Sequence, residues 1–173
     1  MENKRIDMIL VDENDNEIWL EEKIITHQKW LLHRAISVII INKKWEMLLQ
    51  QRALNKYHCW WMWTNATCTH PYKNESNIEA AHRRLQEEMG FDTDLKEIFE
   101  FKYLAEFNNW LIENEYDHVF IGYYDWEVNP NKEEVNDFKW VSIPDIQDDI
   151  FAETEIYTQW FKIILGQYSS SIE

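Results

Sequence analysis

The alternation of apolar and polar residues in the first part of the chain predicts short strands. Residues Ile6 to Val11 and Ile18 to Leu20 flank a polar turn, a pattern that is typical of a hairpin. The segment Arg34 to Ile41 is rich in β-branched residues, and a turn separates it from the apolar start of Met47 to Arg52. We therefore expect two adjacent strands with a buried face after the hairpin, followed by an aromatic-rich loop.

A helix is predicted after residue 76. Ser76 and Glu79 have the spacing of a capping box, and Gly90 suits the left-handed position that ends a helix. Four apolar residues between them recur at helical spacing and form the expected core stripe: Ile78, Ala81, Leu85 and Met89.

The rest of the chain alternates between strand and helix patterns. Leu95 to Glu106, Trp110 to Asp125 and Asp137 to Val141 are predicted strands, and Ile156 to Leu165 is a predicted closing helix. No linker interrupts residues 1–173. We expect one α+β domain with an α/β/α layered arrangement.

Composition and charge exclude several classes of protein. A formal charge of −15 disfavours nucleic-acid binding, which depends on clustered Lys and Arg. The longest apolar run, Val38 to Ile41, is too short to cross a bilayer, and no signal-peptide pattern opens the chain. With only Cys59 and Cys68 as cysteines, no disulfide framework is expected. We expect a cytoplasmic protein without nucleic-acid or membrane partners.

The candidate chemistry gathers around residues 63–90. Cys68 lies two residues before His70, so its thiol is a candidate for proton transfer or nucleophilic attack, against the commoner alternative of a buried structural cysteine. Imidazoles at His27, His33 and His70, with two carboxylates in the run Glu113-Asn114-Glu115, suit a divalent metal. No standard zinc spacing is present, and any single histidine has a structural alternative.

A second group of charges suggests a phosphate site. Glutamates of the predicted helix suit Mg²⁺ on a diphosphate, and basic residues nearby suit its oxygens. A solvated helix face explains the same glutamates. The residues are Glu75, Glu87 and Glu88, with Arg52, Lys56 and Arg84.

Taken together, these motifs resemble the type I isopentenyl-diphosphate isomerases of the Nudix superfamily. The resemblance covers about residues 5–165. Its most specific pieces are Leu31-Leu32-His33-Arg34-Ala35, Leu48-Leu49-Gln50-Gln51-Arg52, Trp63-Thr64-Asn65 leading to Cys68-Thr69-His70-Pro71, Glu113-Asn114-Glu115, and Tyr157-Thr158-Gln159-Trp160-Phe161.

The resemblance implies a fold and a reaction. The fold is a mixed sheet packed between helices, and the reaction interconverts isopentenyl and dimethylallyl diphosphate through a tertiary carbocation. By this likeness Cys68 and Glu115 are proton-transfer groups on opposite faces of the substrate. Tyr103 assists them, and Trp160 holds its ring against the carbocation. Which of Cys68 and Glu115 is the acid in the forward direction stays open.

The resemblance also implies ligands. A first metal, Mn²⁺, Mg²⁺ or Zn²⁺, would be held by five side chains, with solvent or a second oxygen of Glu115 in the sixth position. Glu88 would help to hold Mg²⁺ on the diphosphate, which the basic residues receive, and the protein would be a monomer or a weak homodimer. The five ligands are His27, His33, His70, Glu113 and Glu115, and the basic residues are Lys23, Arg52, Lys56 and Arg84.

The Nudix box is degenerate in this sequence. Thr69 replaces its opening glycine, Glu75 and Arg83 are kept, and Arg84 stands where hydrolases place a glutamate. Losing that carboxylate weakens the activation of water by a metal. A Nudix diphosphohydrolase and a non-catalytic binding relative are therefore the less favoured alternatives.

Tryptophan is abundant and glycine is scarce. The chain has 10 tryptophans and 3 glycines, whereas glycine usually makes up about 7% of residues. Six tryptophans stand where the family and turn chemistry favour glycine: Trp19, Trp30, Trp45, Trp60, Trp61 and Trp110. We hypothesise that some of them are UGA codons that the source organism reads as glycine. The alternative is genuine aromatics in a divergent enzyme, in which Trp60 and Trp61 would crowd the pocket mouth or misplace its loop and so impair catalysis.

Overall fold

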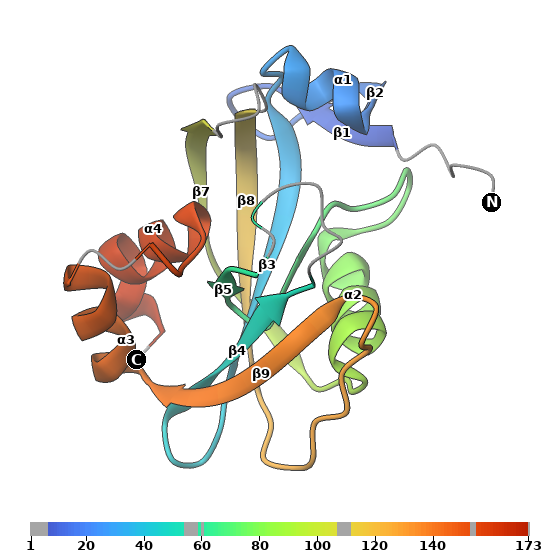
Figure 1. Cartoon of the computed structure of the whole chain (residues 1–173). Coiled ribbons are helices and arrows are strands. Elements are labelled where there is room, and N and C mark those ends of the chain that lie inside the picture. Colours follow the sequence, from blue (N-terminus) through green and yellow to red (C-terminus); the bar gives the residue numbers. More distant parts are fainter. Residues whose placement is uncertain (1–6, 54–58, 60, 107–111, 153–154, 173) are drawn as a thin grey trace.

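The strands of the protein form one curled, mixed sheet (Figure 1). A computed structural model describes residues 7–53, 59, 61–106, 112–152 and 155–172. Across these residues the sheet has nine strands, and β3 is its organising strand because it pairs with β1, β4, β6 and β8. The pairing of β3 with β8 is parallel, which makes the sheet mixed. The strands are β1 (Asp7–Val11), β2 (Glu17–Glu22), β3 (His33–Ile41), β4 (Glu46–Arg52), β5 (Trp63–Thr64), β6 (Thr67–Thr69), β7 (Leu95–Glu106), β8 (Ile112–Tyr123) and β9 (Val135–Ser142).

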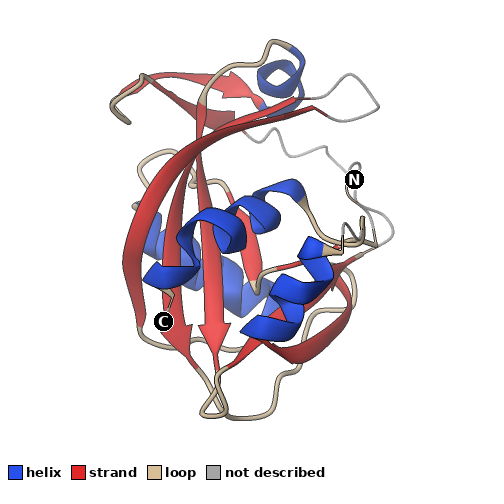
Figure 2. Ribbon diagram, turned by 90° about the vertical axis from the view of Figure 1, so that its left-hand side faces the viewer, coloured by secondary structure: helices blue, strands red, loops and turns tan. Residues whose placement is uncertain are grey.

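Helices cover both faces of the central strands (Figures 1 and 2). Ile36, Val38 and Ile40 of β3 share a core with α2, whereas Ile39 and Ile41 share a second core with α3 and α4. Burial on both faces explains why this strand is a continuous apolar run instead of an alternating one. The predicted layered α+β arrangement is confirmed. The helices are α1 (Lys23–Gln28), α2 (Asn77–Met89), α3 (Ile143–Phe151) and α4 (Gln159–Tyr168), followed by the 3₁₀ turn η1 (Ser169–Ser171).

The predicted caps of α2 are both present. The Ser76 hydroxyl accepts from the Glu79 amide, and the Glu79 carboxylate accepts from the Ser76 amide. Gly90 ends the helix at φ 77°, and a Cβ there would lie 2.3 Å from the carbonyl oxygen of Asn129. Both the backbone angle and the close approach therefore require glycine at this position.

Several elements differ from the sequence prediction. The helices α1 and α3 and the short strands β5 and β6 were not predicted. Helices of six and nine residues, and strands of two and three, show too little periodicity in the sequence. The predicted start of the closing helix at Ile156 is wrong. Tyr157 instead forms a bridge with Trp63, and the helix begins after Thr158. The predicted limits of β7, Leu95 and Glu106, are confirmed, and those of the other predicted strands differ by one to a few residues. Trp110 lies outside the described residues.

Three of the six suspect tryptophans have a left-handed backbone. The φ angles are 60° at Trp30, 61° at Trp45 and 61° at Trp61. Trp19 instead lies within β2 opposite Leu10, so its backbone does not call for glycine. Trp60 and Trp110 lie outside the described residues. None of the other described tryptophans has a positive φ, and these are Trp63, Trp126, Trp140 and Trp160.

Within the described ranges, no helix combines the length and the apolar character needed to cross a bilayer.

Candidate active site

A cavity of about 320 Å³ opens over the middle of β3. Its wall joins side chains from α1, α2, α4 and six strands, which are far apart in the sequence. It collects ten predicted site residues: Lys23, Arg52, Cys68, His70, Arg84, Glu88, Tyr103, Glu113, Glu115 and Trp160. Lys56 lies outside the described residues. Trp61 is not part of the described wall, contrary to the expectation that it would crowd the pocket.

Strand register explains how the site forms. On β3, His33 lies opposite Glu115 of β8, and Ser37 lies opposite Cys68 of β6. Residues two apart on a strand point to the same face, so the ladder brings these groups to one side of the sheet. Cys68 and Glu115 therefore reach the same cavity from opposite sides of β3. Tyr103 joins them because it lies opposite Glu115 on β7.

The Cys68 thiol has three polar neighbours. The indole Nε1 of Trp160 donates to its Sγ at 3.0 Å, and Sγ donates to Oδ1 of Asn65 at 3.3 Å. The hydroxyl of Ser37 lies 3.7 Å from Sγ. Burial raises the pKa of the Cys68 thiol to about 12, so the thiol keeps its proton at neutral pH. Cys68 can therefore donate a proton at neutral pH, and it is a poor nucleophile.

Glu115 lies in the opposite protonation state. Its Oε2 accepts from the Tyr103 hydroxyl at 2.5 Å, and its Oε1 lies 3.0 Å from Nε2 of His70. Burial and the charge of Glu113 raise the pKa of Glu115, but the neighbouring imidazoles of His33 and His70 outweigh them and lower it overall. Burial raises the pKa of Tyr103 well above its usual value, which keeps the phenol a donor. Glu115 is therefore a carboxylate ready to accept a proton.

The three predicted histidines meet at one point. One ligand atom each from His27, His33, His70 and Glu113 lies within 4.8 Å of all the others. His27 bonds through Nε2 to Glu113 at 2.8 Å, and burial lowers the pKa of His70 to about 4, which keeps its ring neutral. Imidazoles and carboxylates are ligands that suit first-row divalent metals.

The surroundings of Nε2 of His33 indicate whether a cation fits among these ligands. His33 donates through Nδ1 to the carbonyl of Leu31 at 2.9 Å, which leaves a lone pair on Nε2. That Nε2 is buried without a hydrogen-bond partner and lies 3.8 Å from Glu113 Oε2 and 3.6 Å from Glu115 Oε1. A lone pair facing two carboxylates is unfavourable unless a cation lies between them, and the Nδ1 bond to a carbonyl is the usual outer support of a metal-binding histidine. The residues therefore fit a divalent metal.

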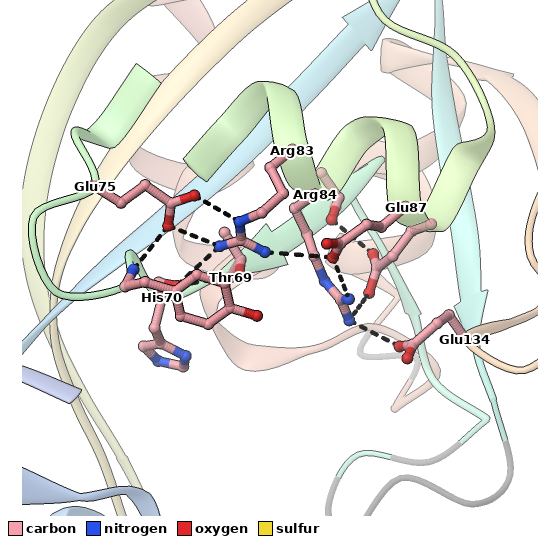
Figure 3. A network of polar contacts seen from close by, with 10 residues as sticks. Thr69, His70, Glu75, Arg83, Arg84, Glu87 and Glu134 are labelled. Carbon is pink, nitrogen blue, oxygen red and sulfur yellow. Dashed lines mark hydrogen bonds and ion pairs between the residues drawn. The ribbon is translucent and has the colours of Figure 1, made fainter. Parts of the chain in front are cut away.

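The N-terminal half of α2 is tied to the loop before it (Figure 3). Arg83 forms a two-pronged ion pair with Glu75, at 2.6 Å and 2.9 Å, and Glu75 also accepts from the amide of Tyr72 at 2.7 Å. These bonds hold the loop that carries His70. The kept Nudix residues Glu75 and Arg83 thus position the site.

Arg84 lies among three carboxylates. Its guanidinium is 3.1 Å from Glu87, 2.5 Å from Glu88 and 2.7 Å from Glu134 (Figure 3). Glu88 is buried, and its other oxygen accepts from Gln50 and Thr67. At this position the chain therefore places a positive charge among three carboxylates.

Sequence reasoning missed several polar residues of the site. Ser37 and Asp117 are buried on β3 and β8, and Glu134 precedes β9. The signal for Asp117 was a charged residue within an apolar strand, two positions after Glu115. Ser37 carried no comparable signal, because its nearness to Cys68 depends on strand pairing.

Comparison with known proteins agrees with this geometry. Residues 31–161 match the family model described as NUDIX domain. The chain belongs to the Nudix family. Among its curated relatives, the isopentenyl-diphosphate Delta-isomerase 2 of Photorhabdus laumondii is 48% identical over 162 residues, covering 94% of this chain and 92% of the relative. An isopentenyl-diphosphate Delta-isomerase of Serratia proteamaculans is 42% identical and covers 91% and 88%.

Solved structures support the Nudix fold of this family member. A protein of Deinococcus radiodurans superposes with a TM-score of 0.76 at 14% identity, covering 94% of this chain and 99% of that one. A MutT Nudix hydrolase from Burkholderia pseudomallei gives 0.63 at 15% identity, covering 79% and 98%. At such identities the likeness concerns the fold alone. The predicted Nudix fold is thus confirmed.

Proposed function

We propose that this Nudix protein is an isopentenyl-diphosphate isomerase, which interconverts isopentenyl and dimethylallyl diphosphate. One observation carries the proposal: a protonated thiol, Cys68, and an ionised carboxylate, Glu115, face one cavity from opposite sides of β3. Moving a double bond by one carbon requires adding one proton and removing another. The names of the relatives support the same reaction.

The protonation states suggest a division of labour. Cys68 gives its proton to the alkene, and the tertiary carbocation that forms loses a proton from the neighbouring carbon to Glu115. One proton is added and one is removed, so the composition of the substrate does not change. Tyr103 holds Glu115 in place through its hydroxyl. The indole of Trp160, which bonds to Cys68, offers its ring to the cation.

The metal belongs to the carboxylate side of the site. His27, His33, His70, Glu113 and Glu115 would hold a divalent ion, for which Mn²⁺, Mg²⁺ and Zn²⁺ are the candidates. When bound, the ion supplies positive charge that balances the two buried glutamates. Oε2 of Glu115 already accepts from Tyr103, so Oε1 would be the oxygen of Glu115 that faces the ion.

Basic residues of the cavity wall would receive the diphosphate. Lys23, Arg52 and Arg84 line it, and Glu88 would share Mg²⁺ with the phosphate oxygens. The apolar wall, which includes Met8, would face the isoprenoid part. We also propose a cytoplasmic protein, since Cys59 and Cys68 are both free thiols. That it acts as a monomer or weak homodimer stays a prediction.

A hydrolase is the second candidate, and the position of Arg84 argues against it. Arg84 stands at the Nudix-box position where hydrolases place a glutamate, so the chain lacks one of the carboxylates with which a metal would activate water. A binding protein without turnover is the third candidate. Neither explains why a thiol and a carboxylate in opposite protonation states share one cavity.

Product analysis separates the candidates. We expect the protein with isopentenyl diphosphate and Mg²⁺ to form dimethylallyl diphosphate. Phosphate or monophosphate release would indicate a hydrolase, and tight binding without turnover would indicate a binding protein.

The proposed acid and base can be tested by substitution. Cys68→Ala and Glu115→Gln should each lower kcat by about a thousandfold or more, in line with the loss of a positioned acid or base. The matched control is Cys59→Ser, since Cys59 packs against the core and is not part of the described cavity wall. Near-normal turnover in Cys68→Ala or Glu115→Gln would remove this mechanism.

A further inference from the structure

A second buried polar pair lies behind the Cys68 thiol. Ser37 and Asp117 are each 1% exposed, on the neighbouring parallel strands β3 and β8. The Ser37 hydroxyl donates to Oδ2 of Asp117 at 2.7 Å, and Oγ of Ser37 lies 3.7 Å from Sγ of Cys68. Ser37 therefore connects the buried carboxyl to the thiol.

The directions of these hydrogen bonds set the orientation of the thiol. The Ser37 hydroxyl is held by its bond to Asp117, and either Ser37 or Cys68 can be the donor in the contact between them. Trp160 donates to Sγ, and Sγ donates in turn to Oδ1 of Asn65. If Asp117 did not hold Ser37, the hydroxyl could turn and change the hydrogen bonds that the sulfur makes.

Fold stability does not account for Asp117. Its Oδ1 is buried without a hydrogen-bond partner, and an unsatisfied buried polar atom costs free energy that one bond to Ser37 does not return. An apolar residue of similar size would leave no unpaired polar atom at this position. A costly buried group beside a reactive one points to a role in the site.

We infer that Ser37, held in orientation by Asp117, is a positioning residue for the Cys68 thiol. The pair fixes which groups around the sulfur donate and which accept, so that the thiol proton starts from one defined position beneath the substrate. The inference rests on the proposed function for its kinetic consequence, but the orientation of the thiol can be measured without turnover.

A double-mutant cycle tests the kinetic part. Asp117→Val and Ser37→Ala should each lower kcat by about tenfold to a hundredfold with little change in KM, since a displaced reacting group costs this much. In the Ser37→Ala background, Asp117→Val should have less than about a twofold further effect, because its influence passes through Ser37. Ser37→Thr, which keeps the hydroxyl, should recover most of the activity.

Stability measurements separate positioning from a structural role. Asp117→Val should keep or raise the Tm while it lowers kcat. The control is Tyr157→Phe, which removes another buried hydroxyl bonded to a carboxylate, Asp149, at 2.9 Å and away from the described cavity wall. It should lower Tm and leave kcat unchanged. Additive effects in the cycle, or a loss of kcat that only follows a loss of Tm, would overturn the inference.

An infrared measurement keeps the test independent of activity. The S–H stretching band of Cys68, obtained as the difference between the protein and its Cys68→Ala variant, should shift in both Ser37→Ala and Asp117→Val. Absence of any shift would overturn the inference even in an active isomerase. A shift in a protein without isomerase activity would instead support the positioning of the thiol and reject the proposed function.

Discussion

At the scale of single residues, the tryptophans with a left-handed backbone stand out. Trp45 has φ 61° and is 55% exposed, in the turn between β3 and β4. An L-residue pays about 1–2 kcal/mol in this conformation, and a large ring on the surface gains little packing in return. Trp30 and Trp61 share the same geometry. The backbone therefore supports the glycine hypothesis at these three positions and not at Trp19.

Replacing Trp45 tests the strain. Trp45→Gly should raise the free energy of unfolding by about 1 kcal/mol, because glycine adopts positive φ without steric cost. The matched control is Trp19→Gly, at a similarly exposed tryptophan in the extended strand β2, which should lower it by about 0.5–1 kcal/mol. Urea denaturation measures both. Equal losses in the two variants would mean that Trp45 is not strained.

The origin of these residues can be read from the gene. The hypothesis predicts UGA codons at Trp30, Trp45 and Trp61, and UGG codons at Trp63, Trp140 and Trp160. UGG codons at all six suspect positions would refute the hypothesis.

At the scale of elements, α2 shows how a local signal is used by the site. Its capping box and Gly90 are encoded within a short stretch, and they define where the helix begins and ends. The helix then presents Arg83, Arg84 and Glu88 at fixed spacing to the cavity. The same segment could be predicted from sequence because its stabilising bonds are between near neighbours. In contrast, β5 and β6 form only because β4 and β3 supply partners.

Removing the cap of α2 should weaken the fold modestly. Ser76→Ala loses the bond to the Glu79 amide and the return bond through the Ser76 hydroxyl, so the free energy of unfolding should fall by about 1 kcal/mol. Ser170→Ala, at an exposed serine in η1, should change it by less than about 0.5 kcal/mol. Thermal or urea unfolding measures the free energy of unfolding of both variants. An equal effect in the two variants would show that the cap contributes nothing.

At the scale of the whole molecule, the metal cluster links distant parts of the chain. His27 comes from α1, His33 from β3, His70 from the loop after β6, and Glu113 from β8. A cation held by all four would fasten the hairpin end of the protein to the central strands. Because the unfolded chain does not hold these groups together, the ion binds the native state and stabilises it.

Divalent metal should therefore raise the Tm. At a free concentration of about 100 times its Kd, an ion that binds only the native state adds about 2.7 kcal/mol. Glu113→Gln should reduce the Tm rise, whereas Glu97→Gln, in a more exposed acidic group with Glu100 and His118, should leave it unchanged. Calorimetry with Mn²⁺, Mg²⁺ and Zn²⁺ in turn measures the effect. An unchanged rise in Glu113→Gln would place the ion elsewhere.

The sequence by itself determined where the main strands follow one another along the chain and where α2 begins and ends. Through a family resemblance, it also determined which residues to expect in the site. These features depend on periodicity, caps and motifs, which lie within a few residues of one another. That residues 1–173 form one domain stays a prediction of the same kind.

Only the tertiary structure decided how those residues meet. The parallel pairing of β3 with β8 places His33 beside Glu115, and the pairing of β3 with β6 places Ser37 beside Cys68. Such contacts join residues 31 to 82 positions apart, and no local pattern encodes them. Burial, which follows from the same packing, then gives Cys68 and Glu115 their opposite protonation states. The physical reason is that both register and desolvation are properties of the assembled sheet.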